Sequence, residues 1–198
     1  MLINEQDEML DYIAKSADKK KGDRRLSIIR EAQSSSPEWC RSAKIPCAIM
    51  DVEFEEFDDD PDFVLFKKAK LGSQSAEPAL VVPITVKGVV VDLTACRLRD
   101  RLIAVIDSRF HTLGVESLDK EDEDGPVTLY RDPISFIQNG CDGAVVVSWG
   151  SCFLGYSALN LIATASSIHC ETKALAERLV EEQSKRFPKI FYAAAPHG

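Results

Sequence analysis

One cysteine of the sequence stands where a nucleophile would be activated. Cys152 follows Gly150 and Ser151, a few residues after the apolar run 145–147, and this order predicts a turn from a buried strand into a helix. At the start of a helix, backbone N–H groups and the helix dipole favour the thiolate, which is the reactive form of cysteine. His169 lies downstream as a general base, with Glu171 to orient it. The three residues predict a cysteine hydrolase; the alternative is that Cys152 is a small buried core residue.

The order of these three residues resembles the active site of class I glutamine amidotransferases, in which a strand leads through a cysteine turn into a helix. The resemblance implies an amidotransferase-like enzyme with Cys152 as the nucleophile. That family has a Gly-x-Cys-x-Gly turn, whereas Gly155 comes one residue too late here. Its His-x-Glu pair also lies far downstream, whereas His169 is only 17 residues from Cys152. The resemblance therefore covers the order of the groups and not their spacing.

A second candidate site is the acidic segment, residues 51–62, which holds eight carboxylates and no basic residue. Oxygen ligands suit hard cations, so Asp58 and Asp60 are candidate ligands for Mg²⁺ or Ca²⁺ and for a metal-dependent activity. The segment has neither the glycine nor the terminal glutamate of an EF-hand loop. Two alternatives remain open, a solvated loop and an acidic patch that meets a basic protein partner.

A third candidate is the basic segment, residues 15–30. It carries seven Lys and Arg residues against Asp18 and Asp23. Such a stretch can face phosphate groups, although charge runs more often form a solvated helix face. The net charge of −8 argues against broad nonspecific DNA binding, because duplex affinity depends on cations that neutralise phosphates. Nucleic acid is therefore expected only at a local surface, made by Lys19, Lys20, Lys21, Arg24 and Arg25.

The composition is that of an ordinary folded protein. The chain has 198 residues, of which 45% are hydrophobic and 28% charged. No apolar run approaches the roughly 18 residues that span a bilayer, and the first eight residues lack the basic and apolar pattern of a signal peptide. We therefore expect a cytoplasmic protein without a membrane segment.

Its six cysteines lack paired spacing, so most should be reduced and buried.

The elements before Gly72 are predicted to be mainly helical. Apolar residues at helical spacing predict helices over 4–17 and 23–33, and residues 1–43 form an N-terminal helical segment. An α/β domain is expected over 44–198. It begins with an extended run over 45–57, and Asp60-Pro61 then predicts the start of a helix that reaches Leu71.

The rest of the chain predicts a hairpin followed by alternating strands and helices. Two β-branched runs, 79–86 and 89–95, flank the turn Lys87-Gly88, and 102–106 should add a third strand. Alternation then predicts a parallel sheet with right-handed crossovers in an α/β, or α+β, fold. Its expected strands cover 127–130, 143–147, 161–165 and 190–193, and its expected helices run from Asp132-Pro133 to Asn139 and over 168–187.

The hairpin carries a family resemblance. The run from Glu77 to Ile84, followed by Gly88 and the run 89–93, resembles the region before the toprim domain in primase-type replication proteins of phages and mobile elements. A toprim site has Glu-Gly at one strand end and Asp-x-Asp at the next, but 147–149 and 165–167 occupy the nearest strand ends here. The resemblance implies a noncatalytic or degenerate binding protein in nucleic-acid processing, which would act through its charged segments.

Overall fold

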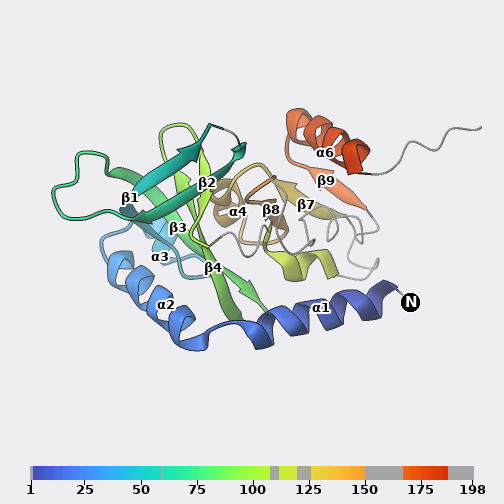
Figure 1. Cartoon of the computed structure of the whole chain (residues 1–198), viewed down its shortest axis with the longest axis horizontal. Coiled ribbons are helices and arrows are strands. Elements are labelled where there is room, and N and C mark those ends of the chain that lie inside the picture. Colours follow the sequence, from blue (N-terminus) through green and yellow to red (C-terminus); the bar gives the residue numbers. More distant parts are fainter. Residues whose placement is uncertain (1, 59, 108–111, 120–125, 150–166, 187–198) are drawn as a thin grey trace, which may run out of the picture.

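The fold consists of several parts that follow one another along the sequence. The computed structural model describes residues 2–58, 60–107, 112–119, 126–149 and 167–186. N-terminal helices come first, then a closed five-stranded barrel, then a four-stranded mixed sheet and a C-terminal helix (Figure 1). The predicted combination of α-helices with a sheet that contains parallel strands is confirmed.

The N-terminal helices are α1 (Leu2–Ser16), α2 (Lys19–Gln33) and the short α3 (Glu38–Arg41). Helix α2 begins four residues earlier than the predicted Asp23, because Asp18 is its N-cap and the Asp18 side chain accepts a hydrogen bond from Lys21 N at 3.2 Å. Leu10 of α1 and Ile29 of α2 are buried against the barrel strands. Helices α1 and α2 thus contribute side chains to the same hydrophobic core as the strands.

The barrel consists of β1 (Ala48–Phe57), β2 (Asp60–Lys68), β3 (Glu77–Val86), β4 (Val89–Arg97) and β5 (Ile103–Val105). Its strand order is β1-β2-β5-β4-β3, closed by pairing of β3 with β1. Strands β2 and β5 are parallel, and the other neighbours are antiparallel. The predicted hairpin and its third strand are confirmed as β3, β4 and β5.

The predicted helix from Asp60 to Leu71 is wrong, because residues 60–68 form strand β2. Val64 and Phe66 are buried and alternate with less buried neighbours, and Phe66 lies opposite Phe54 of β1. Aromatic and β-branched residues fit such a half-buried strand surface. Pro61 is tolerated because it stands near the start of the strand.

Close approach between α2 and strand β4 explains a glycine inside the helix. A Cβ on Gly22 would lie 3.0 Å from Val90 O and 3.3 Å from Val90 Cβ. Glycine lowers helix propensity, and here its lack of a side chain lets the helix lie directly on the strand. Lys21 and Arg25 of α2 are thereby brought within reach of Asp107, just beyond β5.

The second sheet has the order β6-β8-β7-β9. Strand β7 pairs in parallel with β8 on one side and with β9 on the other, which confirms the predicted parallel pairing, but β6 pairs antiparallel with β8 and the sheet is mixed. Asp132 caps the short helix α4 and accepts a hydrogen bond from Ser135 N at 2.8 Å. The elements are β6 (Thr112–Leu113), η1 (Val115–Asp119), β7 (Val127–Tyr130), α4 (Pro133–Gln138), β8 (Ala144–Val146), β9 (Ile168–Cys170) and α6 (Lys173–Arg186).

The helix predicted over 168–187 is confirmed as α6 over Lys173–Arg186, but its predicted start is wrong. Its first residues form β9, which pairs in parallel with β7, and helix α6 begins only at Lys173. Thr172 Oγ1 accepts a hydrogen bond from Leu175 N at 3.2 Å and so satisfies an amide of the first helical turn. The strands predicted over 161–165 and 190–193, and the helix predicted after Cys152, lie outside the described residues.

Three of the cysteines confirm the expected core role. Cys40, Cys47 and Cys96 are buried free thiols. Burial raises the pKa of each, that of Cys96 to about 12, so these thiols stay protonated at neutral pH.

Among the described helices, none combines the length and apolar character that crossing a membrane requires.

Candidate functional site

The predicted cysteine site is only partly described. Cys152 lies outside the described residues. His169 is an exposed residue of strand β9, not of a helix N-terminus as predicted, because it pairs with Thr128 in the sheet. Glu171 follows the strand, and its Oε2 accepts a hydrogen bond from Arg131 N at 2.8 Å. Glu171 therefore orients the β7–α4 connection.

The acidic segment is partly neutralised by basic residues from distant parts of the chain. Glu53 contacts Lys67 at 3.0 Å across the β1–β2 pair, and Glu56 contacts Arg97 at 3.4 Å. Asp62 forms an ion pair with Arg178 of α6. Asp58 is exposed in the turn before β2, and Asp60 is the first residue of that strand. Within the described ranges, no group of three His, Cys, Asp or Glu residues is placed to hold a metal ion.

Of the two strand ends compared with a toprim site, 147–149 follows β8 as expected, and residues 165 and 166 lie outside the described residues. After β8, Ser148 is buried with its Oγ 3.4 Å from Asp62 O, and Trp149 packs against the Arg178 guanidinium, 4.7 Å from the ring centroid. Acidic residues instead follow β7 and β9, as Asp132 and Glu171. Asp132 caps α4 and has Arg131 Nε 3.1 Å from its Oδ2. Both acids thus have local structural partners.

The basic segment of α2 divides into two groups with different surroundings. Lys21 and Arg25 turn toward the barrel, where both donate to Asp107, just beyond β5. The Arg25 side chain is only 8% exposed; its Nη1 donates to Val91 O at 3.2 Å, and its Nη2 lies 3.8 Å from Asp92 Oδ1. These contacts hold α2 against β4 and against the residues that follow β5.

The Asp107 carboxylate is stabilised by this arrangement. Burial alone would raise its pKa, but hydrogen bonds from Lys21 and Arg25 and the charges of both side chains outweigh burial and lower the pKa below the usual 3.8. A lowered pKa in the folded state contributes stability above the unfolded-state value, and this contribution is lost as the pH falls through the folded-state value.

We therefore expect the variant Asp107→Asn to be less stable than the parent by about 1–2 kcal/mol at pH 7. The difference should shrink as the pH falls below about 4, where the parent loses the same charge. Urea unfolding at a series of pH values measures this. Asp58→Asn, on the exposed turn, is the matched control and should change stability by less than about 0.5 kcal/mol throughout. A difference that persists unchanged at low pH would contradict the ionic role of Asp107.

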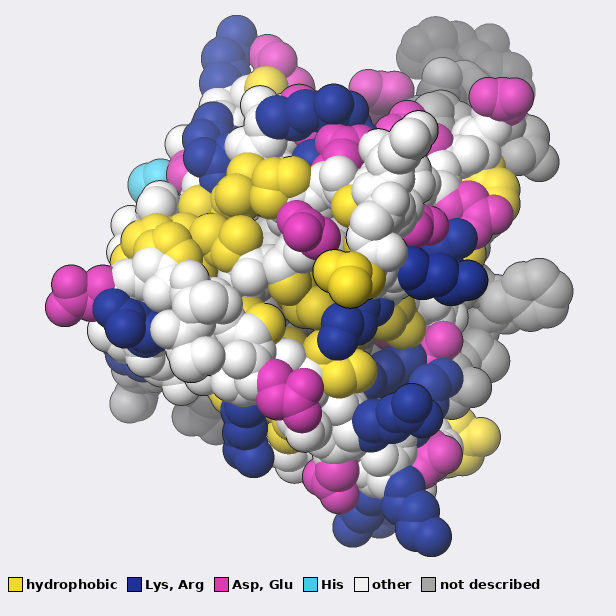
Figure 2. Space-filling model, turned by 90° about the vertical axis from the view of Figure 1, so that its left-hand side faces the viewer, with side chains coloured by type: hydrophobic (Ala, Val, Ile, Leu, Met, Phe, Trp, Pro, Cys, Tyr) yellow, Lys and Arg dark blue, Asp and Glu magenta, His cyan; other side chains and the backbone are white. Residues whose placement is uncertain are grey.

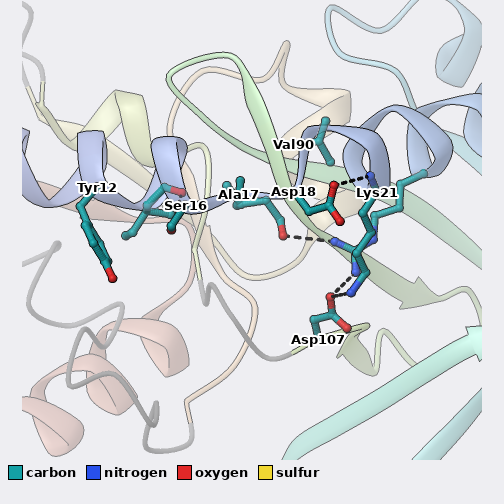
Figure 3. A pocket seen from close by; sticks show the side chains of 10 residues that line it. Tyr12, Ser16, Ala17, Asp18, Lys21, Val90 and Asp107 are labelled. Carbon is teal, nitrogen blue, oxygen red and sulfur yellow. Dashed lines mark hydrogen bonds and ion pairs between the residues drawn. The ribbon is translucent and has the colours of Figure 1, made fainter.

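A pocket of about 170 Å³ opens beside this ionic cluster, between α1, α2 and β4 (Figure 3). Its apolar lining comes from Ile13, Ala17, Val90 and Val91. Figure 3 shows Tyr12 hanging from α1 at one end, and Lys21 meeting Asp107 at the other. Tyr12 is 68% exposed, so its ring can be reached from solvent at this end of the pocket. Sequence reasoning missed this pocket because its walls come from three separate stretches of chain.

The second group of basic residues on α2 faces solvent. Lys19, Lys20, Arg24 and Arg30 are exposed, and no ion pair joins them to a carboxylate of the described residues. Figure 2 shows Lys and Arg side chains gathering at the lower right of the view, on the side of the molecule that α2 occupies in Figure 1. Four exposed cations on one helix, none paired with a carboxylate of the described part of the chain, produce a local positive surface on an acidic protein.

Comparisons with models of known protein families, with curated proteins and with solved structures find no match to this chain.

Proposed function

We propose that this chain is a nucleic-acid-binding module whose contact surface is the exposed face of α2. The observation that carries the proposal is the division of the basic segment: Lys21 and Arg25 hold the helix in place, and Lys19, Lys20, Arg24 and Arg30 point outward. A helix that is held to the barrel and presents these cations suits the phosphate backbone, because binding a phosphate there breaks no ion pair between described residues. The resemblance of the hairpin to primase-type replication proteins points the same way.

The acidic segment is a weaker candidate surface for a basic protein partner. Glu53, Glu56 and Asp62 already have basic partners within the fold, so a docking protein would have to compete with Lys67, Arg97 and Arg178. The pKa of Glu53 is lowered by its hydrogen bonds from Ser73 and Lys67, which reflects a carboxylate that is already satisfied. The exposed cations of α2, unlike Lys21 and Arg25, have no such competitors among the described residues.

The test is fluorescence anisotropy with a labelled 20-nucleotide single strand and the corresponding duplex over a series of salt concentrations. For Lys20→Gln/Arg24→Gln, we expect the slope of log affinity against log salt on the single strand to fall in magnitude by about 1.4, which is roughly 0.7 per lost phosphate contact. Both residues are exposed and one helical turn apart, so folding should be unaffected.

The matched control is Arg41→Gln/Lys173→Gln, which removes one arginine and one lysine from exposed positions outside α2. It makes the same change in net charge, and we expect it to keep the parent slope. No binding of either probe at low salt, or an equal loss in the two double variants, would overturn the proposal.

A further inference from the structure

We infer that the pocket beside α1 receives one unpaired base of a single-stranded nucleic acid, with Tyr12 stacking on the strand at its mouth. This inference rests on the proposed function and names its substrate class. Asp18 and Lys21 both line the pocket, and the exposed Lys19 and Lys20 lie between them in the first turn of α2. A strand whose phosphates contact this turn therefore passes the mouth of the pocket.

The pocket has the size and lining for a single planar ring. Its volume of about 170 Å³ compares with the roughly 150 Å³ of a cavity that accepts benzene. The ring would lie among the side chains of Ile13, Ala17, Val90 and Val91. A paired base inside a duplex presents neither face and cannot enter such a site. The space thus favours an unstacked base from a single strand.

The charges of the pocket select the base over the phosphate. Its polar end holds the cations Lys21 and Arg25, but Asp107 and Asp92 neutralise them, and Asp18 adds a further carboxylate. The interior therefore has no net positive charge to draw in a phosphate. Carboxylate oxygens at this end accept hydrogen bonds, which suits the amino and imino groups of a base. Phosphates belong outside, on Lys19, Lys20 and Arg24.

Tyr12 supplies the stacking surface. The ring is 68% exposed, at the end of the pocket opposite Asp107. An aromatic ring beside a cationic track is how proteins hold single strands with little sequence preference, because every base has a π face. Leu10 and Ala14 of the same helix are buried, whereas the Tyr12 ring is open to a strand that passes the pocket.

The experiment compares three labelled probes of equal length: a single strand of thymidines, a strand of abasic residues with the same phosphates, and a duplex. We expect the thymidine strand to bind tightest. Tyr12→Ala should weaken its binding about tenfold, the effect of losing one stacked base, whereas Tyr12→Phe should keep the parent affinity. Neither variant should change binding of the abasic strand. Ala17→Leu, which fills the pocket and leaves Tyr12 in place, should also weaken only the thymidine strand.

The outcomes separate the two claims. If the three probes bind equally and the Tyr12 and Ala17 variants change nothing, the basic face binds phosphate but the pocket takes no base, and this inference is overturned alone. If no probe binds the parent protein at low salt, the proposed function itself fails. Thermal unfolding of each variant verifies that a loss of binding does not come from a loss of folding.

Discussion

Replacing Gly143 by alanine should destabilise the protein by about 3 kcal/mol or more, among the largest effects of any single methyl group in this fold. Gly143 has a φ of +127°, a conformation that side chains rarely adopt. A Cβ there would lie 2.3 Å from Thr128 O and 2.9 Å from Tyr130 Cε2. Thr128 belongs to β7, which is held by β8 on one side and β9 on the other, so its carbonyl has no room to withdraw.

Urea unfolding measures the loss, and Gly88→Ala is the matched control. Gly88 also has a positive φ, of +73°, but a Cβ there would have no atom within 4 Å outside its immediate chain neighbours. Its replacement should cost only the conformational penalty of about 1–2 kcal/mol. If the two variants lose the same stability, the clash with β7 is relieved by movement, and the sheet is less rigid at this point than its pairing indicates.

The elements that sequence predicted correctly are those set by neighbouring residues. The Lys87-Gly88 turn specifies its hairpin within a few residues, and Asp132-Pro133 starts a helix by capping it locally. Strand β2, in contrast, is not determined by residues that neighbour it in the sequence. Asp60-Pro61 imitates a helix start, but Phe66 is held opposite Phe54 by pairing with β1, a contact that local patterns do not contain.

The candidate site shows the same limit. The basic residues of α2 are evident in sequence, but their division into structural and exposed groups depends on Asp107, which is 82 residues from Arg25. The pocket depends on Val90 and Val91 of β4 lying beside Tyr12 of α1. One signal was available: a glycine inside the basic helix, Gly22, marks close approach to another element. It implies that the face of the helix that carries Gly22 and, one turn later, Arg25 lies against the barrel.

The variant Arg25→Met should lower the free energy of unfolding by about 3 kcal/mol or more. Arg25 is the cation placed between two carboxylates, and Asp92 is fully buried. The guanidinium lies 3.8 Å from Asp92 Oδ1, so its removal leaves Asp92 without this positive charge. The removal also takes away the Arg25 hydrogen bond to Val91 O. Methionine keeps much of the side-chain volume, so the expected loss comes from charge and hydrogen bonding and not from a cavity.

Lys21→Met is the matched control, because it removes the other cation that contacts Asp107. The Lys21 side chain is 44% exposed, and an exposed ion pair contributes at most about 1 kcal/mol. Equal losses for the two variants would show that burial does not distinguish the two cations. In nucleic-acid binding, both variants should keep the salt dependence of the parent, since neither side chain belongs to the exposed group. The helix would then carry two separate sets of cations, one that stabilises the fold and one that contacts phosphate, as the proposed function requires.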